Sequence, residues 1–122
     1  MKSDAPYSYD GLDRIIHEKA RLSIMTSLIS HPDGLSFNQL KKLCDLTDGN
    51  LSRHVQVLAE AGLVAVQKGY EGNRPHTSCA LTGAGRQRFL DYLNVLERVL
   101  KNAHSATETV SANTTAGKLK PA

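Results

Sequence analysis

The stretch from Thr47 to Gly62 constrains the fold most, because both of its ends carry helix-boundary signals. Thr47 is a favourable N-cap, since its hydroxyl can accept a backbone N–H left free in the first helical turn. Gly62 is the residue that a left-handed C-terminal cap prefers. Between them, Leu51, Val55 and Leu58 recur at the spacing of one helix face. The pattern therefore predicts a helix with one buried side.

The opposite side of this helix is small or polar, and it carries Gly49, Asn50, Arg53 and Gln56, with Ser52 on its flank. In the major groove of DNA, arginine side chains bind guanine, and asparagine or glutamine side chains bind adenine. A solvated helix face needs only polarity. The helix alone therefore fits a groove-binding and a merely solvated surface about equally well.

A second, shorter helix is predicted directly before it. Ser36 and Gln39 form a capping box, in which each side chain satisfies a backbone donor near the other. The expected buried side comprises Phe37, Leu40, Leu43 and Cys44. Only Asp45 and Leu46 separate this helix from Thr47, and so short a link makes two helices cross steeply, as in a helix-turn-helix. This spacing favours the groove-binding interpretation.

The preceding residues predict a flexible arm over residues 1–10, followed by a helical turn from Leu12 and a longer helix that ends before Pro32. After Gly62 the pattern changes to short β-strands over 63–68 and 76–81, joined by a loop over 70–75. This predicts a hairpin with a basic tip, in which Pro75 holds Arg74 extended.

Thr82 is expected to cap a last helix over residues 83–102, in which Gly83 and Gly85 allow either a close backbone approach or a frayed turn. Its apolar side is wider than one core contact needs. We interpret it as a homodimer interface, although it could instead wrap its own domain. The expected interface comprises Phe89, Leu90, Tyr92, Leu93, Leu96, Val99 and Leu100. Residues 103–122 have almost nothing to bury and are expected to be disordered.

The chain of 122 residues is long enough for one domain, here 11–102, and its formal charge of +3 suits a nucleic-acid partner. Cys44 and Cys79 are too few for a disulfide framework, and no apolar run has membrane-spanning length, so a cytoplasmic protein without membrane contact is expected. No nucleophile with a paired base, phosphate-binding loop or carboxylate cluster indicates catalysis or a cofactor. We therefore expect neither an enzyme nor a cofactor-binding protein.

Four blocks of sequence follow one another in order. They are Leu12-Asp13-Arg14-Ile15-Ile16-His17-Glu18 with Arg21-Leu22; Leu46-Thr47-Asp48-Gly49-Asn50-Leu51-Ser52-Arg53-His54-Val55, continued by Leu58-Ala59-Glu60-Ala61-Gly62-Leu63-Val64; Gly72-Asn73-Arg74-Pro75 with Thr77; and Leu81-Thr82-Gly83-Ala84-Gly85-Arg86. Together they resemble compact, stand-alone winged helix-turn-helix transcriptional regulators, similar to the MarR and ArsR types. The resemblance covers about Leu12 to Leu100, and it implies an α+β fold: mainly α, with a small β-hairpin and a C-terminal dimerisation helix.

The resemblance implies a homodimer that reads double-stranded DNA specifically, with one recognition helix per subunit in the major groove and the wing at the minor groove or backbone. The groove set would be Asn50, Ser52, Arg53 and Gln56, with Thr47 near phosphate, and the wing set Lys68, Arg74 and His76. A winged-helix module that binds protein instead of DNA is the alternative. An effector would lodge between the dimer helices and the DNA-binding part, but no convergent polar set marks a pocket.

Metal-sensing ArsR-type proteins carry paired cysteines on the helix before the recognition helix. Here Cys44 stands alone at that place, and a thiolate metal site needs several soft ligands together. We therefore expect no metal site, and we interpret Cys44 and Cys79 as structural residues. A redox pair of the two cysteines is the alternative, and it would require them to lie close together. His54, at the edge of the core stripe, is expected to pack rather than to bind a ligand.

Overall fold

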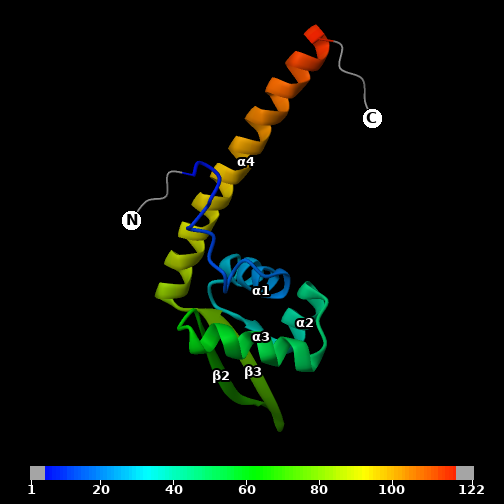
Figure 1. Ribbon diagram of the computed structural model, residues 1–122. Coiled ribbons are helices and arrows are strands. Elements are labelled where there is room, and N and C mark those ends of the chain that lie inside the picture. The colour runs from blue at the N-terminus through cyan, green and yellow to red at the C-terminus, as the bar shows by residue number, and fades with distance from the viewer. Residues whose placement is uncertain (1–4, 118–122) are drawn as a thin grey trace.

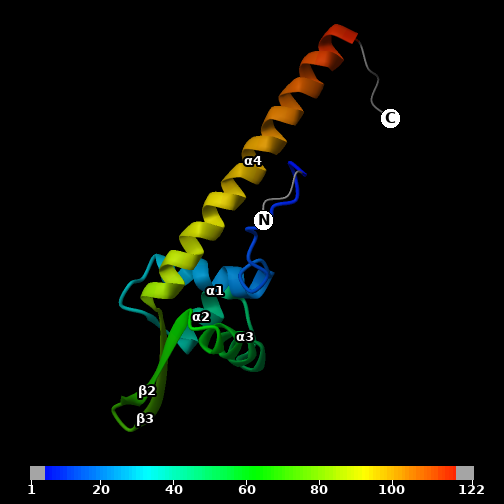
Figure 2. The same ribbon diagram turned by 60° about the vertical axis from the view of Figure 1, so that its left-hand side comes forward.

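The computed structural model describes residues 5–117, and the side chains of the last helix through residue 109. In chain order the elements are α1 (Lys19–Ile29), β1 (Leu35–Ser36), α2 (Phe37–Cys44), α3 (Asp48–Glu60), β2 (Val64–Glu71), β3 (Arg74–Leu81) and α4 (Gly83–Gly117). The three shorter helices form a compact body, from which the β2–β3 hairpin and the far half of α4 project at opposite ends (Figures 1 and 2). The α+β fold class predicted from the sequence is confirmed.

The central helix α3 forms as the sequence predicts. The Thr47 hydroxyl accepts the backbone N–H of Asn50 at 3.2 Å, and Gly62 has a positive φ of 78° just beyond the helix end. Its buried side comprises Leu51, His54, Val55 and Leu58. The predicted packing of His54 is therefore confirmed, since its residue exposure is only 8%.

The turn between α2 and α3 depends on one residue in the left-handed region. Ser36 and Gln39 form the predicted capping box at the start of α2, and Asp45 ends that helix with φ 54° and ψ 55°. Aspartate tolerates this conformation better than most residues other than glycine. The reversal allows α3 to begin at Asp48. Leu43, in contrast, is 59% exposed, so its predicted place on the buried side of α2 is wrong.

The sheet has three antiparallel strands in the order β1–β3–β2. Strand pairing continues outward to Glu71 opposite Arg74, so the predicted loop over 70–75 shrinks to Gly72 and Asn73. Gly72 has a positive φ of 66°, which a two-residue hairpin turn commonly requires. Backbone pairing across the hairpin overrides the loop-like composition of this segment, and the wing is longer than predicted.

The first half of α4 completes the hydrophobic core. Phe89 and Tyr92 are each 1% exposed, and their rings stack with centroids 6.2 Å apart. They pack with residues of α1, α2 and α3, among them Ile24, Leu40 and Leu51. Both aromatic residues were predicted in the dimer interface, and that assignment is wrong because their side chains are already buried within the subunit.

The second half of α4 extends further than the sequence predicts. The helix was expected to end at Asn102, with disorder from residue 103, but it continues to Gly117. No proline or glycine interrupts residues 103–116, and alanine recurs among them, so the backbone hydrogen bonds of the helix continue. The side chains of residues 103–109 are exposed, so this part of the helix continues without packing on the body. Residues 118–122 of the expected disordered tail lie outside the described residues.

The segment before α1 is folded against α4. A flexible arm was predicted over residues 1–10, but in residues 5–10 Tyr9 adopts a positive φ of 49°, and its hydroxyl accepts from Asn102 Nδ2 at 2.8 Å. A Cβ on Gly11 would lie 2.6 Å from a Val95 methyl group. These contacts place the segment along α4, while residues 1–4 lie outside the described part of the chain.

The start of α4 meets the end of α3 at the backbone. Thr82 donates its backbone N–H to the Leu63 carbonyl at 3.1 Å and its hydroxyl to the Gly62 carbonyl at 2.7 Å. The same hydroxyl accepts the Gly85 N–H at 2.9 Å. A Cβ on Gly85 would collide with the Leu63 carbonyl, whereas one on Gly83 would meet nothing within 4 Å. The close-approach interpretation therefore holds for Gly85.

No helix in the described residues is long and apolar enough to cross a membrane.

The two glycines make a matched pair of variants. Gly85→Ala is expected to destabilise the protein by about 1–3 kcal/mol, because backbone rather than a flexible side chain must move. Gly83→Ala is expected to stabilise it by roughly 0.5–1 kcal/mol, through the better helix propensity of alanine. Urea unfolding of both variants measures the difference, and equal effects of the two substitutions would contradict the close contact.

Candidate nucleic-acid interface

The outward side of α3 is a continuous polar surface. Asn50, Ser52, Arg53 and Gln56 are all exposed there, as the sequence predicts. Arg53 Nη2 donates to Asn50 Oδ1 at 3.4 Å. Gln56 Nε2 donates to Glu60 Oε2 at 3.5 Å. These long, exposed hydrogen bonds hold the side chains weakly, so each can exchange its neighbour for a base edge.

Two acidic residues flank this surface. Asp48 in the first turn of α3 pairs with Lys41 of α2, with Oδ1 and Nζ 2.6 Å apart. Glu60 lies at the other end of the helix. Lys41 thus offsets one of the two carboxylates, a role that the sequence analysis missed. The signal was available, since a steep two-residue link brings the last turn of α2 beside the first turn of α3.

Thr47 lies at the start of α3, where its side chain caps the helix. Its oxygen caps α3, and its hydroxyl proton remains available to donate. The exposed start of a helix attracts anions, because its N–H groups point outward. Thr47 therefore suits a phosphate contact at the start of α3.

The predicted wing residues divide between the two faces of the hairpin. Side chains alternate across a strand, so Lys68 shares a face with Val64 and with Cys79, which are buried at the hairpin base. Arg74 and His76 lie on the other face. Lys68 and Arg74 are both exposed. The structure therefore brings Arg74 and His76 together and separates them from Lys68.

The wing tip also carries a carboxylate and an aromatic ring that the sequence analysis did not assign to the interface. Glu71 stands opposite Arg74 in the strand register, and its Oε2 lies 3.2 Å from His76 Nδ1. Tyr70, on the same face as Lys68, is 77% exposed. A tyrosine directly before the polar residues of a hairpin tip is the sequence signal that could have marked it as a contact residue. The wing thus has both signs of charge.

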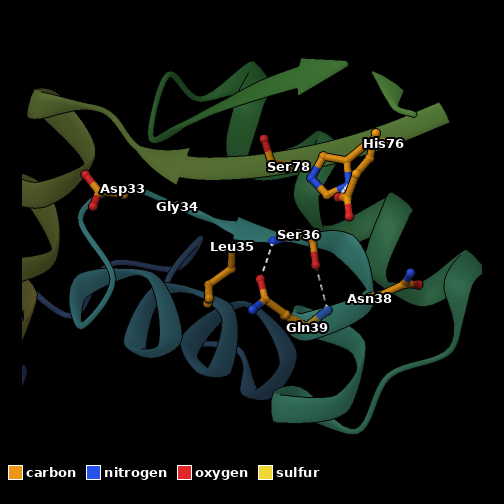
Figure 3. A pocket seen from close by; sticks show the side chains of 9 residues that line it. Asp33, Gly34, Leu35, Ser36, Asn38, Gln39, His76 and Ser78 are labelled. Carbon is orange, nitrogen blue, oxygen red and sulfur yellow. Dashed lines mark hydrogen bonds and ion pairs between the residues drawn. The ribbon is translucent and has the colours of Figure 1, made fainter. Parts of the chain in front are cut away.

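A cleft of about 570 Å³ lies beside the wing base, where β1 leads into α2 (Figure 3). Its lining includes Asp33, Asn38, His76 and Ser78. Ser36 and Gln39 also line it, and the dashed lines of Figure 3 show that they bond to each other's backbone. The side-chain oxygens of Ser36 and Gln39 are therefore already used as hydrogen-bond acceptors within the capping box.

Neither cysteine belongs to a metal-binding cluster in the described part of the chain, where no group of three histidine, cysteine or acidic side chains could hold an ion. Cys44 is half-buried, with Sγ 3.5 Å from the Ser27 hydroxyl. Cys79 is 1% exposed, and burial raises the pKa of its thiol to about 11. The predicted packing of both side chains is confirmed.

One side of α4 presents apolar side chains to solvent. Leu90, Leu93 and Leu100 are 42%, 37% and 51% exposed. Leu96 and Val99, between them, are partly buried. These five residues, without Phe89 and Tyr92, are what remains of the predicted dimer interface. We call them the α4 apolar stripe.

Comparison with known proteins agrees with this arrangement. A family model described as a winged helix DNA-binding domain matches residues 20–100. An uncharacterized protein from Methanocaldococcus jannaschii is 33% identical over 89 residues, covering 73% of this chain and 96% of that protein. The chain belongs to the winged helix DNA-binding family.

Solved structures extend the comparison. A transcriptional regulator homologue from Pyrococcus horikoshii OT3 is 33% identical, with a TM-score of 0.69, covering 75% of this chain and 89% of that one. A regulator of the MarR family from Enterococcus faecalis V583 shares the fold, with 19% identity, a TM-score of 0.63, and coverage of 92% and 96%. The protein is thus a DNA-binding transcriptional regulator with a MarR-like fold, a class of regulators rather than of enzymes.

The carboxylate at the wing tip should weaken DNA binding. Glu71→Gln is expected to raise affinity for any duplex sequence by about two- to fivefold at low salt, because an exposed negative charge near phosphate is removed. Glu97→Gln is the matched control, since Glu97 pairs with Lys101 on the exposed surface of α4. Fluorescence anisotropy with two unrelated duplexes measures the effect, and an unchanged affinity would place Glu71 away from DNA.

Proposed function

We propose that the protein acts as a homodimer that binds a specific double-stranded DNA sequence, with α3 of each subunit in the major groove and the hairpin at the flanking minor groove or backbone. The observation that carries this proposal is the two-sided character of α3. One side is buried through Leu51, Val55 and Leu58, while the other exposes base-reading side chains around Arg53. A helix so placed can enter a groove without disturbing the core.

In this proposal Arg53 binds a guanine edge, with Asn50 and Gln56 on neighbouring bases and Ser52 beside them. Thr47 binds phosphate at the start of α3. On the wing, Arg74 and His76 contact one side of the backbone and Lys68 the other, because they lie on opposite hairpin faces. Base contacts would then give specificity, and the wing contacts general affinity.

The dimer is supported by the α4 apolar stripe. Exposed leucines along one side of a helix favour packing against an identical helix across a two-fold axis. Two recognition helices related in this way read half-sites about one helical turn apart, roughly 34–36 Å. Selection of bound sequences from random DNA tests the proposal, because a specific dimer should enrich a palindromic site with that spacing.

Arg53 is expected to carry sequence preference. Arg53→Ala should weaken binding to the selected site by roughly 1–3 kcal/mol and relax the choice of base at one position, because a bidentate contact is lost. Arg74→Ala should weaken binding to all sequences similarly and reduce the slope of affinity against salt, because a phosphate contact is lost. Titrations at several salt concentrations separate the two. Affinity that is weak and insensitive to salt in the wild type would refute DNA binding itself.

The α4 apolar stripe is expected to determine the oligomeric state. Leu100→Glu should convert the dimer to a monomer, because a charge would be buried at the interface. Leu43→Glu is the matched control, since Leu43 is similarly exposed, at 59%, but lies on α2. Sedimentation equilibrium distinguishes the two species. Dimers of both variants would place the interface elsewhere.

A further inference from the structure

The segment from Asp13 to Arg21, which we call the strap, is hydrogen-bonded to α4 at its first end. Asp13 Oδ2 accepts from Arg88 Nε at 2.6 Å. The other carboxylate oxygen accepts the backbone N–H groups of Ile15 at 2.9 Å and of Ile16 at 3.3 Å. Asp13 therefore both folds the strap and fixes it to the helix that carries the α4 apolar stripe.

The second end of the strap contacts α3. Arg21 Nε donates to the Ile15 carbonyl at 2.6 Å, and Arg21 Nη1 lies 3.2 Å from His54 Nδ1. A continuous hydrogen-bonded path therefore runs from Arg88 through Asp13, Ile15 and Arg21 to His54. A direct link between α4 and the strap runs beside it, since Tyr92 Oη lies 2.7 Å from the Nδ1 atom of the strap residue His17.

The hydrogen-bonded path from Arg88 ends at His54, which lies next to Arg53, the residue proposed to recognise a base. His54 follows Arg53 in α3, but it is buried, so the strap contacts the recognition helix from the core side. We propose that Arg21 is a positioning residue for DNA recognition: it fixes the rotation of α3 relative to α4, and it does so only while His54 is unprotonated. This inference rests on the DNA-binding function proposed above.

The dependence on protonation follows from donor chemistry. A guanidinium group has only donors, so His54 Nδ1 can accept from Arg21 only when that nitrogen carries no proton. A protonated imidazole would face the Arg21 cation. It would find its acceptor in Glu18 instead, whose Oε1 lies 3.8 Å from Nδ1. Protonation therefore exchanges one partner of His54 for another.

The charges around His54 are set by the start of α1. Arg21 and Glu18 face it there, while Asp13 and Arg88 form the ion pair at the α4 end of the strap. Burial alone would raise the pKa of Glu18. The Arg21 backbone N–H, the charge of a protonated His54 and the charge of Arg21 together outweigh burial, and the pKa of Glu18 is lowered. Glu18 is thus a carboxylate ready to receive a protonated His54.

The first test replaces Arg21 by lysine, which keeps the charge but has all its donors on one nitrogen and so lacks the two separate nitrogens with which Arg21 reaches Ile15 and His54. Arg21→Lys is expected to reduce affinity for the selected site by about two- to thirtyfold, with a smaller loss on unrelated DNA. Arg98→Lys is the matched control, because Arg98 is an exposed arginine of α4 outside the strap. Thermal unfolding of each variant fixes a temperature at which all are folded.

The second test uses pH. His54→Asn places an amide oxygen near the position of Nδ1, where it accepts at every pH in the range of histidine titration. From pH 8 to pH 5.5, specific affinity of the wild type relative to His54→Asn is expected to fall by roughly three- to tenfold, the effect of one hydrogen bond. The ratio removes contributions from other histidines, His76 included. In Arg21→Lys, specific affinity should also depend less on pH than in the wild type. This second variant tests the same claim if His54→Asn does not fold.

The possible results separate the positioning role of Arg21 from a purely structural role and from a failure of the proposed DNA binding. If the wild type binds specific DNA but Arg21→Lys loses affinity equally on specific and unrelated DNA, or its pH profile matches that of the wild type, the strap is only structural and the inference fails. If the wild type shows no salt-dependent, specific binding, the proposed function fails first. A specific loss in Arg21→Lys together with a flattened pH profile supports the positioning role.

Discussion

The arrangement of the molecule depends on the contacts that one backbone carbonyl group, that of Leu63, makes with the start of α4. It accepts the Thr82 N–H, and it lies so close to Gly85 that no side chain fits there. Leu63 itself is bonded back to the last turn of α3 through the Leu58 carbonyl, at 2.9 Å. Helix α3, the hairpin and α4 therefore meet within a few residues. Backbone atoms, together with the Thr82 hydroxyl, make this junction.

Local rules were enough to predict the helix-turn-helix. The hydroxyl cap of Thr47 and the reciprocal cap of Ser36 and Gln39 involve residues three positions apart, so the sequence determines them directly. The polar outer side of α3 could also be predicted, because the helical spacing of Leu51, Val55 and Leu58 determines which side is buried. These features suffice to place the residues proposed to read bases, although contact with DNA remains a prediction.

Non-local contacts explain what the sequence could not predict. Phe89 belongs to the same wide apolar stripe as Leu90, and only the packing of α4 on the body decides which of them is buried. The wing tip was assigned to a loop because its composition is polar, but pairing of Glu71 with Arg74 extends the strands. The Asp13–Arg88 ion pair joins positions 75 residues apart. Such pairs follow from topology rather than from local pattern.

The length of α4 has a mechanical consequence. A helix of 35 residues measures about 50 Å at 1.5 Å per residue, and only its first half rests on the body. A rotation of about 5° at the Gly85 junction would move its far end by roughly 4 Å. A displacement too small to break the core at the junction therefore becomes a movement of several ångströms at the far end of the helix.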